Sequence, residues 1–372
     1  MTDGYGVAAK WSVTTSAVAC VAASCVVAGA ASPEPLYSSG MMLSTSNAGS
    51  AWHLDPVARG LDAVAAISCV GASCEAVANM PAGVYLGTSD AGAAWVLQAE
   101  AVTPLKIFSS VALRDVSCSS STVCEGAGFI AVTTTQSEGV LARTTDGGKV
   151  WQIAAQSSAA TLDAVACPSA TVCVAAGASV GQSGGLILRT TNGGGKWTTE
   201  PLPGGAPVLT DVHCFSATRC EAVGASLAYS TVNGATWTKQ TLPTLPQFSG
   251  LLAIACPTSL SCLAVGSSFS SGAVAVFTVN GGSSWKIEKL PAGVATLDEV
   301  TCPAANACEV AGNVASGNGA LLFSTNVGGT AWTKQAVPPG VANVTGISCT
   351  SLNSCFAAGT TTSDTGVLLK GG

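Results

Sequence analysis

The chain has 372 residues, of which 48% are hydrophobic and only 9% are charged, and its formal net charge is −6. Lys and Arg together number 14 and form no block, so the composition excludes the basic footprint of a nucleic-acid-binding protein. Gly, Ala, Ser, Thr and Val dominate the sequence, which favours strands joined by tight turns over helices.

The first apolar run, residues 17–31, resembles the apolar core of a signal peptide and has Lys10 upstream. Cys20 and Cys25 within this run fall in register with cysteine pairs that recur along the chain. We therefore predict that the run is a buried hairpin of a first repeat. No other run approaches the length of a membrane span.

Eight copies of one unit fill the chain, and each copy carries two cysteines. The first cysteines of successive copies are 42 to 49 residues apart, a period typical of repeat architectures whose units cannot bury their apolar faces alone. We predict a single domain over residues 1–372, built from eight repeats of about 46 residues. The pairs are Cys20/Cys25, Cys69/Cys74, Cys118/Cys124, Cys167/Cys173, Cys214/Cys220, Cys256/Cys262, Cys302/Cys308 and Cys349/Cys355.

The regular pairing of all cysteines predicts one structural disulfide in each repeat, and therefore an oxidising, extracellular or cell-surface location. Each bridge would close a loop of about seven residues and stabilise the fold by roughly 2 kcal/mol. Free buried thiols and metal ligation are the alternatives. Zinc is the weaker of these interpretations, because the pairs lack the usual Cys-x2-4-Cys spacing and lie too far apart in sequence.

The fourth copy shows the unit clearly. Residues 162–167, 173–177, 185–190 and 197–200 read as four short strands, and an Asn-Gly turn joins the last two. Four strands with Gly-rich turns at this period predict an all-β fold, an eight-bladed β-propeller of four-stranded antiparallel blades with one disulfide hairpin per blade.

The last turn of the unit follows the pattern Ser/Thr-x-Asp-x-Gly-x-x-Trp. Asp90 before Trp95 and Asp146 before Trp151 fit it fully, and the chain thereby resembles the Asp-box (bacterial neuraminidase repeat) β-propellers. Three further copies place Asn at the Asp position, and two are degenerate. The Asn copies are Asn47, Asn192 and Asn280, and the degenerate copies have Val232 and Val327.

The box residues are interpreted as structural. The Asp or Asn side chain is expected to cap backbone N–H groups within its own turn. The tryptophans are expected to pack between blades, each with one indole N–H to satisfy. These tryptophans are Trp11, Trp52, Trp95, Trp151, Trp197, Trp237, Trp285 and Trp332.

The two ends of the chain suggest how the ring closes. The eighth cysteine pair is followed by one further strand, residues 366–370, and by no tryptophan. Trp11 precedes every cysteine pair. We therefore predict that residues 10–13 form the outer strand of the eighth blade and close the ring.

The resemblance implies a sialidase-like fold without sialidase chemistry. Sialidases of this class use an arginine triad and a tyrosine nucleophile, and the sequence lacks their Arg-Ile-Pro motif. The two histidines, His53 and His213, have no Gly-x-Ser-x-Gly elbow beside them. A glycosidase would need two carboxylates at a set separation, and no motif singles out such a pair. We assign no catalytic residue and no metal ligand.

Charged residues gather just before the first cysteine in several copies, on the strand expected to border the central channel. If they face one mouth of the channel, they form an acidic rim that could hold a cation or the hydroxyls of a glycan. The alternative is that each carboxylate caps local backbone. The candidates are Arg114, Asp115, Asp163, Asp211, His213, Asp298 and Glu299.

These observations predict a secreted, non-catalytic binding or adhesion module that uses one face of the propeller. Its candidate partners are a carbohydrate or a cell-surface protein, and we expect neither a cofactor nor a nucleic-acid partner. One alternative is an Asp-box glycosidase or polysaccharide lyase with carboxylates at the channel mouth. A second alternative is a structural surface or assembly protein, which the low charge content favours.

Overall fold

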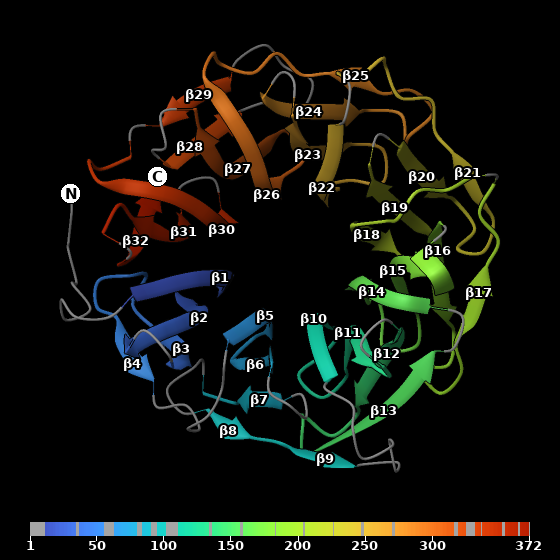
Figure 1. Cartoon of the computed structure of the whole chain (residues 1–372), viewed down its shortest axis with the longest axis horizontal. Helices are drawn as coiled ribbons and strands as arrows, with labels where there is room; N and C mark the ends of the chain where they lie inside the picture. Colours follow the sequence, from blue (N-terminus) through green and yellow to red (C-terminus); the bar gives the residue numbers. More distant parts are fainter. Residues whose placement is uncertain are drawn as a thin grey trace.

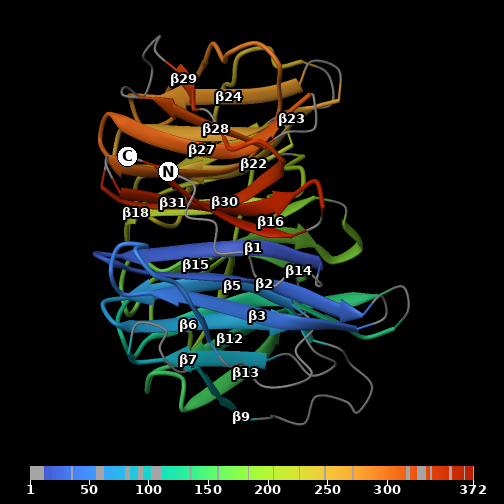
Figure 2. The ribbon, with the colours of Figure 1, turned by 90° about the vertical axis from the view of Figure 1, so that its left-hand side faces the viewer.

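The protein is described here by a computed structural model. It describes residues 12–371 except 35–36, 56–62, 80–83, 91–94, 102–110, 134–135, 157–158, 183, 204, 226, 247–248, 270–271, 316–318, 325–331, 336, 352–353 and 364. Antiparallel sheets succeed one another around a ring, and the innermost strand of each sheet lies nearest the axis (Figures 1 and 2).

Sheets are numbered here in chain order. Sheet 1 contains β1 (Ser12–Val21), β2 (Ser24–Glu34), β3 (Tyr37–Thr45) and β4 (His53–Asp55). Sheet 2 contains β5 (Ala63–Val70), β6 (Ser73–Asn79), β7 (Val84–Thr88) and β8 (Val96–Leu97). Sheet 3 contains β10 (Val111–Cys118), β11 (Cys124–Ala131), β12 (Ser137–Thr144) and β13 (Val150–Gln156), with β9 (Ala99–Ala101) parallel to β13.

The later sheets repeat the same order. Sheet 4 contains β14 (Ala159–Ala166), β15 (Cys173–Ser179), β16 (Gly185–Thr190) and β17 (Thr198–Glu200), with a short 3-10 turn at Val180–Gln182. Sheet 5 contains β18 (Asp211–Ser216), β19 (Arg219–Gly224), β20 (Leu227–Thr231) and β21 (Trp237–Lys239). Sheet 6 contains β22 (Ser249–Ala255), β23 (Cys262–Ser268), β24 (Gly272–Thr278) and β25 (Lys286–Ile287). Sheet 7 contains β26 (Val294–Ala304), β27 (Ala307–Val314), β28 (Gly319–Ser324) and β29 (Trp332–Gln335). The terminal sheet contains β30 (Val341–Ser351), β31 (Ser354–Thr361) and β32 (Gly366–Gly371).

The predicted ring of eight four-stranded blades closed by the N-terminal strand is wrong. Seven sheets are complete blades of four antiparallel strands, and no fourth strand joins the terminal sheet among the described residues. Ser12 and Val13 instead extend the inner strand of sheet 1, where they pair with Ser32 and Ala31. Their backbone hydrogen bonds are therefore used within sheet 1. Lys10 and Trp11 lie outside the described residues.

The terminal sheet packs directly against sheet 1, so β30 and β1 are neighbours around the axis (Figure 1). The Thr345 hydroxyl donates to the Thr15 carbonyl at 2.7 Å, and the Cys20 N–H donates to the Ser348 hydroxyl at 3.2 Å. Side chain to backbone hydrogen bonds thus join the two ends of the array.

The apolar core lies between sheets rather than within one. Val77 of sheet 2 packs with Leu113, Val116 and Trp151 of sheet 3, and this cluster is buried. Equivalent clusters recur at the following interfaces. Each sheet therefore depends on its neighbours to cover its apolar faces, as expected for a repeat architecture.

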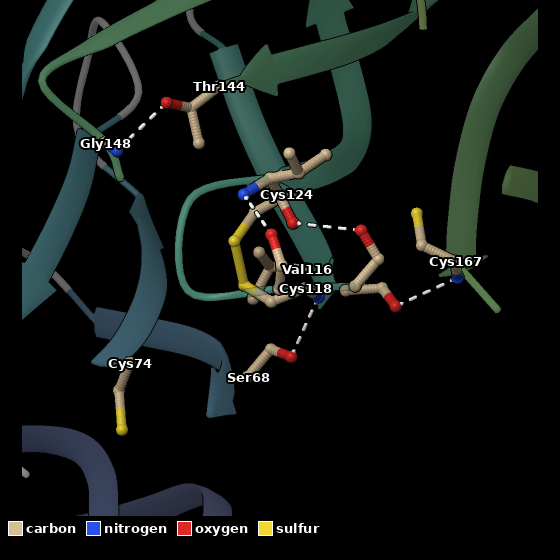
Figure 3. Close-up of a disulfide and its surroundings, with 12 residues drawn as sticks. Ser68, Cys74, Val116, Cys118, Cys124, Thr144, Gly148 and Cys167 are labelled. Atoms are coloured by element: carbon tan, nitrogen blue, oxygen red, sulfur yellow. Dashed lines mark hydrogen bonds between the residues drawn. A yellow bond between two sulfur atoms is a disulfide. The ribbon is translucent and has the colours of Figure 1, made fainter. Parts of the chain in front are cut away.

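All eight predicted disulfides are present, and no described cysteine is free. Each disulfide crosses the hairpin between the first and second strands of its sheet. Figure 3 shows the Cys118–Cys124 bridge, with the Ser68 hydroxyl of sheet 2 accepting a hydrogen bond from the Cys118 N–H at 3.0 Å. The disulfide hairpin is thus also tied to the preceding sheet. The other bridges are Cys20–Cys25, Cys69–Cys74, Cys167–Cys173, Cys214–Cys220, Cys256–Cys262, Cys302–Cys308 and Cys349–Cys355.

The second cysteine of every bridge is also buried, as Cys74, Cys220 and Cys308 illustrate. These second cysteines of sheets 2, 5 and 7 are 3%, 1% and 0% exposed, and each belongs to an apolar cluster. Their sulfur atoms therefore contribute to the core as apolar groups besides closing a hairpin. The sequence pattern gave the pairing but not this burial, because burial depends on how neighbouring sheets pack.

The box turns lie at the same end of each sheet as the disulfide hairpins, and this end is called the turn face below. The Asp146 Oδ1 accepts from the Thr144 hydroxyl at 2.9 Å and from the Val150 N–H at 3.1 Å. The Thr144 hydroxyl accepts from the Gly148 N–H at 2.9 Å (Figure 3). Asn192 and Asn280 make the same bonds in sheets 4 and 6. The expected capping within the turn is therefore confirmed.

The degenerate copy at Val232 needs a correction. Asn233 performs the capping in sheet 5, because its Oδ1 accepts from the Thr231 hydroxyl at 3.1 Å and from the Thr236 N–H at 2.8 Å. This turn is one residue shorter before Trp237, so matching by a fixed distance from the tryptophan misplaced the capping position. The copy at Val327 lies outside the described residues.

Candidate functional site

A β-bulge recurs in the innermost strands at the position where the sequence placed its charged residues. The pairing register shifts between Leu113 and Asp115, which leaves Arg114 as the extra residue of its strand. The same shift occurs in the innermost strands of sheets 1, 2, 4, 6, 7 and the terminal sheet. A bulge leaves backbone N–H groups outside the ladder, and those groups need other acceptors.

A glycine opposite the bulge permits this geometry. A Cβ placed on Gly177 of β15 would lie 2.2 Å from the Thr161 carbonyl oxygen of β14. Gly128, Gly224, Gly266, Gly312 and Gly359 occupy the same place in their sheets and would produce the same clash. The bulge is therefore built into the repeat.

Asp115 and Asp211 supply the acceptors that the bulges need. Asp115 Oδ1 accepts from its neighbour Val116 N–H, and its Oδ2 accepts from the Val165 N–H of sheet 4, both at 2.8 Å. Asp211 accepts from the Val212 N–H at 2.7 Å and from the Ile254 N–H of sheet 6 at 2.8 Å. Each carboxylate therefore joins the innermost strands of two successive sheets.

Glu299 occupies the equivalent position in sheet 7, and it accepts from the Val300 N–H at 3.3 Å. Burial raises the pKa of Asp115 to about 7 and that of Glu299 to about 8. The charge on Asp211 adds to both shifts, so these carboxylates of sheets 3, 5 and 7 influence one another around the axis. Burial also raises the pKa of Asp211, to about 6.

The remaining charged candidates have partners near the bulges. The Arg114 guanidinium forms an ion pair with Asp163 of sheet 4 at 2.9 Å and lies over the Phe129 ring at 5.1 Å. Asp298 accepts from the Thr296 hydroxyl and from the Asn313 amide, both at 3.3 Å. These contacts leave the bulge carboxylates committed to neighbouring strands and side chains.

His213 lies on β18 two residues beyond Asp211, and no hydrogen bond among the described residues joins it to the other candidates. Its Nδ1 is buried without a hydrogen-bond partner, and burial lowers the pKa of His213 to about 4. In sheets 2 and 3 the same position is a serine, Ser68 or Ser117, which accepts from a cysteine N–H of the next sheet. His213 is therefore uncharged at neutral pH and replaces a framework serine.

A second set of carboxylates was missed by the sequence analysis. Its members directly follow the second cysteine of sheets 2, 3, 5 and 7, which are Cys74, Cys124, Cys220 and Cys308. They are Glu75, Glu125, Glu221 and Glu309, and they are 1–4% exposed. Burial raises the pKa of these groups to about 7 or 8, although Arg143 beside Glu125 and Arg219 beside Glu221 act in the opposite direction.

The residue three positions after each box tryptophan depends on whether the repeat carries one of these glutamates. Sheets 2, 5 and 7 place a glutamine there, namely Gln98, Gln240 and Gln335. Gln98 interacts with Glu75, and Gln335 donates to Glu309 at 3.5 Å. Gln98 Oε1 also accepts from the Trp151 indole N–H of sheet 3 at 2.6 Å. Sheet 1 has the reverse arrangement, with Val26 after the cysteine and Asp55 in the acceptor position beside Trp95. This covariation between repeats was the available sequence signal.

The box tryptophans are framework residues where the structure describes them. Trp95, Trp151, Trp237, Trp285 and Trp332 are buried, and Trp52 packs edge-on against Phe356 of the terminal sheet. Among the seven box tryptophans that the structure describes, only Trp52 and Trp197 are partly exposed. A ligand could therefore reach few of these rings.

Two further features resemble binding sites. Glu309, Cys349 and Cys355 lie close enough together to suggest metal ligation, but both cysteines are held in one disulfide and offer no thiolate. A shallow pocket of about 400 Å³ is lined by Leu227, Lys239, Gln240, Thr241, Leu242, Pro243 and Leu245. The cation expected at the rim stays a prediction. Among the described residues, no helix is long and apolar enough to cross a membrane.

These features define the class of protein as a β-propeller of four-stranded antiparallel blades pinned by disulfides, which indicate an oxidising compartment. No protein-family model matches the sequence, and no curated protein matches it.

Solved structures of other propellers resemble the chain. YCF48 from Cyanidioschyzon merolae is 15% identical with a TM-score of 0.54, over 86% of this chain and 97% of that one. YCF48 bound to D1 peptide is 16% identical with a TM-score of 0.54, over 82% and 93%. An ancestral GH74 enzyme is 11% identical with a TM-score of 0.59, over 85% of this chain and 47% of that one. Virginiamycin B lyase from Staphylococcus aureus is 12% identical with a TM-score of 0.57, over 82% and 94%. At these identities the likeness establishes the fold alone.

Proposed function

We propose that the protein is a secreted, non-catalytic binding module of the Asp-box propeller type. The observation that carries the proposal is the engagement of Asp115 and Asp211, whose carboxylate oxygens accept backbone N–H groups from two sheets at once. A glycosidase needs two carboxyl groups free to reach its substrate. Asp115 and Asp211 are instead engaged in hydrogen bonds that hold the innermost strands together.

The other charged candidates support the same conclusion. Arg114 and Asp163 are paired with each other, and Asp298 is held by Thr296 and Asn313. His213 is neutral and sits in a position where other sheets have a structural serine. The rim expected to hold a ligand therefore has few polar groups left to offer one.

The ligand is better sought on an outer face, where turns vary on a rigid frame. The exposed aromatic side chains of the described residues are few, whereas exposed aliphatic side chains are numerous. This composition favours a peptide or protein partner over a polysaccharide. YCF48, a propeller of related fold, is a precedent because it has been solved with a D1 peptide bound.

The test is a binding screen of the oxidised protein against immobilised polysaccharides and peptide arrays, with an assay for newly formed reducing ends. Retention without product supports a binding module. Product formation overturns the proposal, and loss of that product in Asp115→Asn and Asp211→Asn variants that remain folded would identify the carboxylates responsible. Retention on no member of either panel would also contradict the proposal and favour a structural role.

A further inference from the structure

Four large apolar side chains are exposed on the turn face of sheets 5 and 6. Phe215 is 49% exposed, Val232 65%, Leu260 51% and Val279 53%. Phe215 and Leu260 lie in the disulfide hairpins of the two sheets, and Val232 and Val279 lie in their box turns. These four residues are called the apolar turn patch.

Contacts between the surrounding turns bring the turns of sheets 5 and 6 next to one another. Within sheet 6, the Gly281 N–H of the box turn donates to the Leu260 carbonyl of the disulfide hairpin at 2.8 Å. Between the sheets, the Arg219 guanidinium of sheet 5 lies directly against Gly281. The patch therefore covers neighbouring turns of two adjacent sheets that hydrogen bonds and packing hold in place.

The framework does not require apolar residues at these positions. The residue equivalent to Val232 and Val279 is Thr145 in sheet 3 and Thr191 in sheet 4, and both threonines are exposed. The residue equivalent to Leu260 is Thr122 in sheet 3 and Thr171 in sheet 4. Polar residues thus serve the same turns elsewhere, so the fold does not require apolar groups here, and a cluster of exposed apolar side chains is a candidate interaction surface.

The charge around the patch indicates what occupies it. The box turns of sheets 4, 5 and 6 have Asn where sheets 2 and 3 have Asp. Arg189, Lys196 and Arg219 lie at the same turns, and the Arg189 guanidinium packs against Gly234 of sheet 5. Glu200 lies beside Arg189 and Glu221 beside Arg219, but Glu221 is buried and burial raises its pKa to about 8. The exposed side chains of these turns therefore carry more positive than negative charge, although the whole chain is acidic.

We propose that the apolar turn patch binds an extended acidic peptide segment that carries apolar side chains. The inference rests on the proposed binding function and names its partner. A second copy of the chain fits less well, because a two-fold contact would place the basic side chains of both copies face to face. Four side chains are also few for a protein–protein interface, which buries about 800 Å² on each partner.

The test uses a peptide array in which acidic and apolar content vary independently, followed by fluorescence anisotropy with the best peptide at low and high salt. The variant replaces the patch with residues that the framework already carries: Phe215→Ser, Val232→Thr, Leu260→Thr and Val279→Thr. We expect peptides with both acidic and apolar residues to be enriched. We expect the variant to weaken binding by about tenfold or more, and Arg219→Gln to reduce the salt dependence.

The matched control is Phe269→Ser, which removes a side chain that is 97% exposed at the opposite end of sheet 6. Unchanged binding in this control and an unchanged melting temperature in all variants make a loss of affinity specific to the patch. Retained affinity in the patch variant, enrichment of basic peptides, or self-association that the patch variant abolishes would each overturn the inference. If the patch variant still retains a ligand from the broader screen, the binding function stands and only the patch assignment fails.

Discussion

Replacing Glu221 by Gln is expected to stabilise the protein at pH 8 and to flatten the pH dependence of its stability. Glu221 is 2% exposed, and neither carboxylate oxygen has a hydrogen-bond partner within the described residues. Burial raises the pKa of Glu221 from 4.5 to about 8, and the Arg219 charge opposes this shift only in part. Gln has the shape of the protonated carboxyl group and cannot ionise.

The sign and size of the effect follow from proton linkage. Between pH 4.5 and pH 8 the folded state holds a proton that the unfolded state has released, so stability falls as the pH rises. The contribution is fully present below pH 4.5 and is lost as the pH passes through 8. The shift from 4.5 to about 8 is about 3.5 pKa units, and each unit corresponds to about 1.4 kcal/mol, so the full loss is on the order of 5 kcal/mol for this residue.

The assay is urea denaturation of the wild type and the Glu221→Gln variant from pH 4.5 to pH 8.5. The difference between the two proteins matters, because other groups titrate in both. We expect equal stability at the acidic end and a more stable variant at the alkaline end. A variant less stable than the wild type at pH 8 would show that Glu221 is ionised and stabilised by Arg219, which refutes the reasoning.

Three further predictions concern the framework. Asp211→Ala should lower the free energy of unfolding by about 2–4 kcal/mol in urea denaturation, because it leaves two backbone N–H groups without acceptors; a change below half that size would argue against the inter-sheet role. Asn233→Ala should cost about 1 kcal/mol, as expected for a lost turn cap, whereas Val232→Ala should cost almost nothing; the opposite order would restore the capping position to Val232. Replacing Cys167 and Cys173 together by Ala should cost about 2 kcal/mol, and an unchanged melting temperature would show that the bridge adds no stability.

The parts of the fold that the sequence predicted are those set by local chemistry. The spacing of Cys167 and Cys173 across a hairpin, and the capping residues of the box turns, fix short-range geometry that recurs in each repeat. The closure of the ring was predicted wrongly because it depends on long-range pairing. Nothing local to Ser12 and Val13 distinguishes an outer strand of the terminal sheet from an extension of β1.

The role of the charged candidates could not be read from their spacing because the bulge was not foreseen. Without it, Arg114 and Asp115 would alternate between opposite sides of β10, and no N–H group would call for a carboxylate. With it, Asp115 serves both its own strand and β14. The alternation of Asp115, Ala164, Asp211 and Ala253 around the ring then has a physical cause, since one carboxylate satisfies two sheets.

The way the repeats differ from one another separates framework from function. Sheet 2 has Glu75 after its second cysteine and Gln98 three residues after its box tryptophan, whereas sheet 1 has Val26 and Asp55 at these two positions. Each sheet therefore has one carboxyl group at one of the two positions. Such compensated differences preserve packing and need no ligand to explain them. The apolar turn patch differs from the other sheets without any compensating change, and its side chains face solvent. Exposed apolar side chains lower the solubility of a protein, and these four do not stabilise the isolated fold. A partner that covers these side chains supplies the missing compensation, which is why the turn face of sheets 5 and 6 is the place to seek the ligand.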